Sequence, residues 1–178
     1  MLFRWGFVAD LLNFIIGLPV ALILYTLFKK INWFLSTLAL IFILIQTAII
    51  ALNLLFQLYP LLISASNGNA LPFTTEQLAA LSQISMNMQA QGYAIGLSFF
   101  GVACLLMGYV YYFSGLIPNI FGILYATAGL GYLINSFTMF LSRGFNNPVF
   151  NYVAIPILMG EFSLTCWLII KGVRDRDA

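Results

Sequence analysis

Five long apolar stretches, separated by short polar segments, set the pattern of this 178-residue chain. A helix that crosses the hydrocarbon core of a bilayer needs about 20 mostly apolar residues, and each stretch reaches that length. The pattern therefore predicts an all-α, polytopic transmembrane helical bundle in which residues 1–178 form a single domain. The expected spans are residues 7–28, 34–59, 91–113, 118–141 and 149–170, with an outer loop and helix over residues 64–90.

The overall composition agrees with a chain that lives in lipid. Hydrophobic residues make up 62% of the sequence, charged residues only 7%, and the mean hydropathy is +1.01. A soluble domain carries about a quarter charged residues, so a soluble domain is excluded. The net charge of +2 is small and dispersed, which argues against a nucleic-acid partner. The partners expected are the lipid bilayer and either a second copy of the chain or another membrane protein.

The basic residues predict which way the bundle faces. Short loops rich in Lys and Arg stay on the cytoplasmic side. With five spans, one side of the membrane receives five basic residues and the other receives two. The larger group is Lys29, Lys30, Lys171, Arg174 and Arg176, and the smaller is Arg4 and Arg143. The expected topology is therefore N-out and C-in.

Polar side chains that enter the apolar stretches recur at helical spacing and gather in the outer half of the predicted bundle. Asn53 and Gln57, four residues apart, share one helical face. Lipid offers no hydrogen-bond partners, so such groups must face one another or water. Two interpretations stay open: an internal network that fixes helix packing, or a pocket that opens outward and holds a ligand. The candidate pocket residues are Asp10, Asn13, Asn53, Gln57, Gln91, Asn135 and Glu161.

Glu161 is the one ionisable residue deep inside an apolar stretch. It precedes Lys171 by ten residues, which places it roughly 15 Å from the inner boundary, near the centre of the bilayer. A charge at that depth costs at least about 2.5 kcal/mol. Pro156, five residues earlier, should kink this helix. The hypothesis is that Glu161 floors the outer pocket and binds a proton or a cation there.

Two local patterns predict how the third span begins and packs. Thr74 and Gln77 have the spacing of a capping box, so a helix should start on the outer side, well before the span itself. Its first part, Leu78 to Met88, should either protrude or lie on the membrane surface, with the change near Gly92.

Small residues repeat along the third and fourth spans. They include the pair Gly92-x-x-x-Gly96 and the pair Gly122-x-x-x-Ala126. Such faces let helix backbones approach closely in lipid. The short connection between the two spans makes them an expected antiparallel hairpin.

The sequence lacks the residue types of familiar catalytic and metal sites. It contains no His, which removes the usual general base and the commonest metal ligand. Cys104 and Cys166 both lie inside apolar stretches, where thiols behave as small hydrophobes. We therefore expect no metal, no cofactor and no enzymatic activity.

Several segments resemble a known membrane family. They are Phe99-Phe100-Gly101, Gly108-Tyr109, Ser114-Gly115-Leu116-Ile117-Pro118, Gly129-Leu130-Gly131-Tyr132 and Gly160-Glu161-Phe162-Ser163-Leu164-Thr165-Cys166-Trp167. They are similar to the bacterial polytopic membrane family called domain of unknown function 4386. That resemblance implies a multi-pass protein of the bacterial cytoplasmic membrane, with no established activity, cofactor or partner. Members usually resemble six-span proteins, so this chain is expected to lack the first helix, ahead of Arg4.

The sequence thus predicts a multispan integral membrane protein of unknown biochemical role. One interpretation is a structural or accessory membrane component that acts through lateral contacts. The alternative is a small transporter or ion-coupled carrier, whose outward-opening polar pocket is floored by Glu161.

Overall fold

The computed structural model describes residues 1–65, 73–142 and 149–172, and these residues form five α-helices and no strand. The helices are α1 (Leu2–Phe28), α2 (Trp33–Ala65), α3 (Thr75–Ser114), α4 (Asn119–Leu141) and α5 (Phe150–Lys171). All five are long and apolar enough to cross a membrane. The predicted all-α bundle with five candidate spans is confirmed. The predicted loop at 66–72 and the basic residues Arg143, Arg174 and Arg176 lie outside the described residues.

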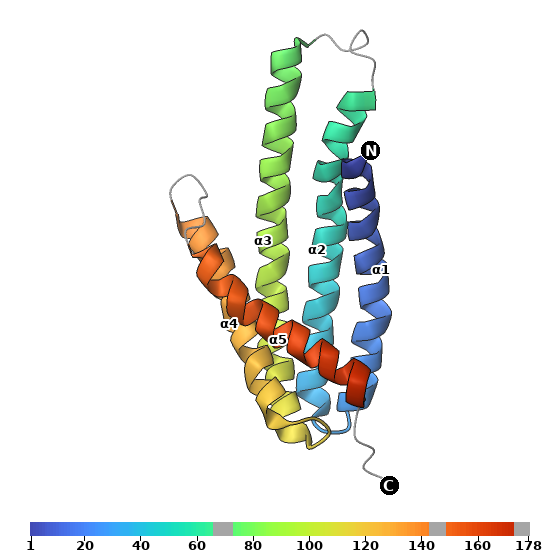
Figure 1. The fold of residues 1–178 in the computed structure, drawn as a ribbon, viewed down its shortest axis with the longest axis vertical. Helices are drawn as coiled ribbons and strands as arrows, with labels where there is room; N and C mark the ends of the chain where they lie inside the picture. Colours follow the sequence, from blue (N-terminus) through green and yellow to red (C-terminus); the bar gives the residue numbers. More distant parts are fainter. Residues whose placement is uncertain (66–72, 143–148, 173–178) are drawn as a thin grey trace.

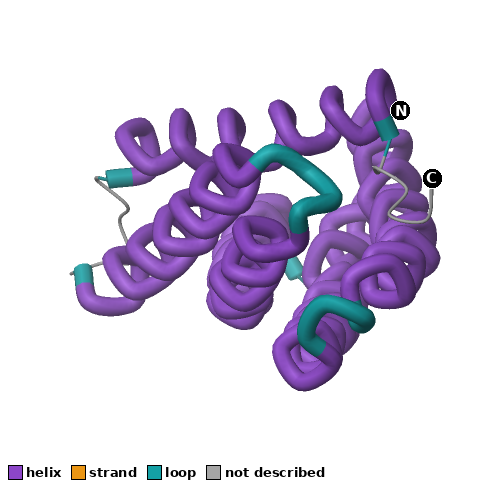
Figure 2. Tube along the Cα trace, turned by 90° about the horizontal axis from the view of Figure 1, so that it is seen from below, coloured by secondary structure: helices purple, strands orange, loops and turns teal. Residues whose placement is uncertain are grey.

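The helices do not pack as a regular barrel of five. The first three run side by side along the long axis, and α4 returns along part of α3, while α5 crosses the bundle obliquely (Figure 1). Seen from below, α5 lies across one side of the bundle, from α4 towards α1 (Figure 2). Among the described residues, α5 makes backbone contacts with α4 but none with α1, α2 or α3. The fifth helix is therefore held to the rest of the bundle mainly by α4.

The tightest core lies at the end of the bundle where α1 passes into α2. Its buried residues are Phe28, Ala39, Met107, Val110, Tyr111, Leu116, Ile117 and Leu164. The rings of Phe28 and Tyr111 meet edge to face, with 4.7 Å between their centroids. Lys29 and Lys30 follow Phe28 directly, so the packed end is also the basic end.

The α3–α4 contact is a seam of glycines and alanine that includes the predicted pair Gly122-x-x-x-Ala126, whereas Gly92 and Gly96 face Asn53 and Ile50 of α2. A Cβ atom added to Gly108 would lie 2.8 Å from the Cβ of Ala126, and one added to Gly129 would lie 2.7 Å from the carbonyl oxygen of Gly101. Real side chains do not tolerate such distances, so glycine is required for this approach. The hairpin turn begins at Gly115, whose φ of 65° lies in the left-handed region that glycine adopts without strain. The predicted antiparallel hairpin is confirmed.

The third helix is a single 40-residue element, about 60 Å long at 1.5 Å per residue. The predicted capping box is present: the backbone N–H of Thr74 donates to Gln77 Oε1, and the backbone N–H of Gln77 donates to Thr74 Oγ1. The helix continues through Gly92 without a break, so the arrangement in which residues 78–88 lie on the membrane surface is wrong. The start of α3 runs in line with the span, and Gly92 stays the predicted point at which the span begins.

The α2–α3 contact explains why α3 stays straight. Asn53 Nδ2 donates to the carbonyl oxygen of Gln89 at 2.6 Å, and Ser85 Oγ donates to the carbonyl oxygen of Phe56 at 2.6 Å. These bonds join the two helices beyond the glycine. The second helix also continues past its predicted end at residue 59, through Pro60 to Ala65.

Candidate ligand-binding cavity

A cavity of about 470 Å³ lies between the five helices, and each helix contributes to its wall. Most of the lining is aliphatic or aromatic. Its amide, hydroxyl and carboxyl groups belong to Asn13 on α1, Gln46 and Thr47 on α2, Tyr93 and Tyr111 on α3, Tyr125 and Tyr132 on α4, and Glu161 and Thr165 on α5. The volume lies within the range of sites for small organic molecules, about 300–1,000 Å³. The cavity therefore has the size and the mixed lining of a ligand site.

Glu161 reaches the cavity because α5 packs closely on α4 beside it. A Cβ atom added to Gly160 would lie 2.5 Å from the carbonyl oxygen of Leu124 and 2.8 Å from the Cβ of Ala128. This close approach brings the hydroxyl of Tyr132 to Glu161, and it donates a hydrogen bond to Oε1 at 2.8 Å. One side-chain hydrogen bond, from Tyr132, therefore joins the carboxyl group of Glu161 to α4.

The ring of Tyr132 is itself positioned by α3. Its centroid lies 5.3 Å from that of Phe100, in an edge-to-face arrangement that aromatic pairs favour. The Tyr132–Glu161 bond thus depends on three helices. Within the described part of the chain, the second carboxyl oxygen of Glu161 has no hydrogen-bond partner, and no Lys or Arg lines the cavity. A carboxyl group in this setting needs a proton or a cation as its companion.

Polar residues lie between this acid and the end of the bundle opposite Lys29 and Lys30. Gln57 Nε2 donates to Asp10 Oδ2 at 3.1 Å, which joins α2 to α1. Asn13, in the cavity wall, follows Asp10 by about one helical turn. Tyr93, on the central helix α3, lines the cavity together with Asn13 and Glu161.

Of the seven candidate pocket residues, Asn13 and Glu161 line the cavity. Asp10 and Gln57 instead pair with each other across α1 and α2. Asn53 joins α2 to α3 through the carbonyl of Gln89.

The remaining two candidates, Gln91 on α3 and Asn135 on α4, are half-buried and buried respectively, outside the cavity lining. Seven lining residues with polar groups were not among the candidates, namely Gln46, Thr47, Tyr93, Tyr111, Tyr125, Tyr132 and Thr165. Tyr132 carried a signal: it is a tyrosine in the middle of a span, whereas aromatic belts place tyrosine at span ends. The cavity is consequently more aromatic than the polar pocket that the sequence predicts.

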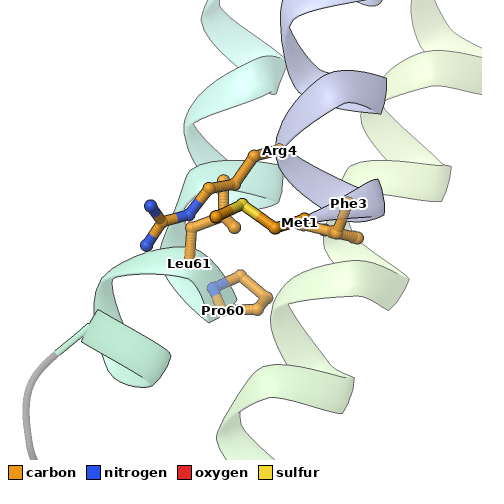
Figure 3. Close-up of a pocket in the computed structure, with 5 residues that line it drawn as sticks. All are labelled: Met1, Phe3, Arg4, Pro60 and Leu61. Carbon is orange, nitrogen blue, oxygen red and sulfur yellow. The ribbon is translucent and has the colours of Figure 1, made fainter.

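A second cavity, also of about 470 Å³, lies where the start of α1 meets the end of α2. It is lined by Met1, Phe3, Arg4, Pro60 and Leu61, and the guanidinium of Arg4 extends beside Leu61 (Figure 3). Arg4 is exposed, and the lining contains no buried polar group. This surface hollow offers less for specific recognition than the central cavity.

Five membrane-length helices around a central cavity define the class: a multi-pass helical membrane protein. The family model described as "Domain of unknown function (DUF4386)" matches residues 1–172, so the chain belongs to that family, as the resemblance predicted. Comparisons with curated proteins and with solved structures gave no match.

Proposed function

We propose that this protein is a small-molecule carrier of the membrane, whose binding site is the central cavity with Glu161 as its principal polar contact. The observation that supports this most is the cavity itself, which touches all five helices and has a single carboxyl group among its described lining residues. Purely structural bundles fill such space with side chains, because interiors are close-packed. A cavity of this volume at the meeting point of every helix is instead typical of a binding site.

The way α5 is attached supports movement around this site. It packs on α4 and makes no backbone contact with the other three helices in the described residues. A small rotation of α5 on α4 would widen or narrow the cavity on the side of α1. Carriers need such a change in access around a fixed site.

The proposed topology is N-out and C-in, in the bacterial cytoplasmic membrane. Because the number of described helices is odd, the first helix begins and the last helix ends on opposite sides of the membrane. The basic residues of the sequence, five against two, favour the packed end as the cytoplasmic one. A C-terminal green fluorescent protein fusion should fluoresce, and a C-terminal alkaline phosphatase fusion should be inactive. The reverse pair of results would overturn the topology.

The binding proposal is tested by photolabelling in lipid nanodiscs with a neutral aryl diazirine. Gly17 lines the cavity, and a Cβ added there meets nothing within 4 Å. The variant Gly17→Leu should therefore fold normally and fill cavity space. We expect it to reduce labelling of the cavity residues Tyr93 and Phe100, while labelling of lipid-facing residues stays unchanged.

Gly6 provides the matched control. It lies on the same helix, outside the cavity, and a Cβ added there also meets nothing within 4 Å. Gly6→Leu should leave labelling of Tyr93 and Phe100 as in the wild type. Equal labelling of these two residues in the Gly17→Leu and Gly6→Leu variants would show that the cavity is not a binding site.

A structural or accessory role is the second candidate, and the exposure of α1 favours it. Among the described side chains of α1, only Ala21 and Phe28 are buried. A helix so little covered by its own bundle offers a face to a second copy or to another membrane protein. Under that role the protein should co-purify with a partner in mild detergent, and Gly17→Leu should be without effect.

A further inference from the structure

We propose that the ligand of the central cavity is a lipophilic organic cation, such as an amine or an onium ion with an apolar body, and that Glu161 releases its proton when this cation binds. This rests on the proposed function, because it assumes that the cavity is occupied. Beyond the proposed function, the inference names the chemical class of the ligand and identifies the proton of Glu161 as the ion that is exchanged for it.

The charge of the lining selects the sign of the ligand. Among the described lining residues, Glu161 has the only carboxyl group, and there is no Lys or Arg. An anionic ligand would meet an acid and no positive partner. A cationic ligand would supply the countercharge that a carboxylate needs in the bilayer, where an unpaired charge is costly.

The aromatic lining adds a second attraction for a cation. Tyr93, Phe100, Tyr111, Tyr125 and Tyr132 all contribute to the wall. The face of an aromatic ring attracts a cation, most strongly where water is excluded. Phe100 and Tyr132, the pair beside Glu161, lie with 5.3 Å between their ring centroids, whereas the ring of Tyr111 is buried against Phe28 and Tyr125. One aromatic pair and one acid are suited to a cation that is spread over an apolar body.

The remaining lining recognises that apolar body. Leu97 on α3 and the α5 residues Leu164, Leu168 and Ile169 give aliphatic walls. A strongly hydrated inorganic ion would lose its water beside a single carboxyl group, because the described residues contain no cluster of three His, Cys, Asp or Glu. An organic cation loses less hydration and gains apolar contact, so it fits this lining better.

The proton exchange is balanced in charge. The neutral carboxylic acid of Glu161 and the cation combine to give a carboxylate paired with the cation, and one proton leaves to water. The titratable groups that interact with Glu161 are Tyr93 and Cys104 from α3, and Tyr125 and Tyr132 from α4. The lining from α1 and α2 adds no titratable group. Free phenols and thiols are neutral at pH 7, so Glu161 is the group that exchanges the proton.

The ligand can reach the cavity sideways from the lipid. Residues of α1, including Val20 and Leu24, face residues of α5, including Leu168, across the cavity. The backbones of these two helices make no contact in the described part of the chain. The cavity is partly open, so a lipophilic cation that has accumulated in the bilayer can enter between these two helices.

The test compares two ions of nearly the same size and shape but opposite charge, tetraphenylphosphonium and tetraphenylborate. Binding to the purified protein in nonionic detergent is measured by equilibrium dialysis, and proton release is measured in weakly buffered solution. We expect tetraphenylphosphonium to bind at least about tenfold more tightly than tetraphenylborate, with release of about one proton per cation bound. Glu161→Gln should abolish the proton release and weaken phosphonium binding by at least about tenfold, whereas Glu161→Asp should keep the release.

Equal or tighter binding of tetraphenylborate would overturn the inference, as would phosphonium binding without proton release. Both results come from the wild type, so they decide the matter even if Glu161→Gln does not fold. The photolabelling experiment separates the two proposals. If Gly17→Leu blocks labelling of the cavity but no phosphonium binds, the cation inference fails and the proposed function stands. If Gly17→Leu leaves the labelling unchanged, both fail.

Discussion

Replacing Gly122 by alanine should destabilise the bundle at the α3–α4 seam. The added Cβ would lie 2.6 Å from the backbone nitrogen of Tyr112, 2.7 Å from the carbonyl oxygen of Gly108 and 2.8 Å from the Cα of Tyr112. All three atoms belong to the backbone of α3, so no side chain can rotate away. Ordinary contact begins near 3.4 Å, and the two helices must therefore separate by roughly 0.8 Å.

The expected cost follows from that separation. Forcing an extra carbon into a well-packed contact costs about 1–3 kcal/mol. The parting helices also lose close contacts at the neighbouring seam residues Gly129 and Gly101. The loss is measured as the free energy of unfolding in mixed micelles, by titration with sodium dodecyl sulphate and circular dichroism.

Gly6→Ala is the matched control, because the new Cβ meets nothing within 4 Å. Both variants gain the helix propensity of alanine over glycine, about 1 kcal/mol, so this gain cancels in the comparison. Gly122→Ala should be less stable than Gly6→Ala by about 1–3 kcal/mol. If the two variants are equally stable, the seam is not held by backbone contact and the reasoning is refuted.

Two further predictions concern the contacts beside the cavity and between α2 and α3. Tyr132→Phe removes the hydrogen bond to Glu161 and should lower the free energy of unfolding by about 0.6 kcal/mol. The control Tyr109→Phe, at a half-exposed tyrosine, should not lower it. Equal losses in the two variants would contradict the hydrogen bond. Gly92→Ala places a Cβ against the side chain of Asn53 and should lower the free energy of unfolding by about 1–3 kcal/mol. Adding Asn53→Ala to give the double variant should recover part of this loss, as measured by the same titration. Strict additivity of the two changes would show that the residues do not meet.

The helices and one of their contacts could be predicted from the sequence because those features are local. Apolar length alone predicts five spans, and the Thr74 cap needs only Gln77, three residues away. The small residues of α3 and α4 lie on either side of a short turn, so their pairing follows from the chain order. The continuation of α2 past Pro60 was missed, since the proline removes only one hydrogen bond and the flanking turns hold.

The site was harder to predict, because its partners lie on different helices. Glu161 could be recognised by itself, as the one acid deep in an apolar stretch. Its partner Tyr132 lies 29 residues earlier, and the two meet only because α5 crosses α4 at Gly160. Helical spacing showed that Asn53 and Gln57 share a face, but it could not show which neighbour each amide meets. In the structure one meets α3 and the other meets α1.

The oblique placement of α5 has a consequence for the order in which the protein is made. Of the five described helices, α5 leaves the ribosome after both helices of the α3–α4 hairpin. Glu161 therefore enters the lipid when its hydrogen-bond donor, Tyr132, is already in position on the neighbouring helix. Glu161, whose carboxyl group is costly to insert into lipid, thus enters beside Tyr132. The packing of α5 on α4 also completes the wall of the cavity. Folding of the bundle and creation of the site are thus one step of biogenesis.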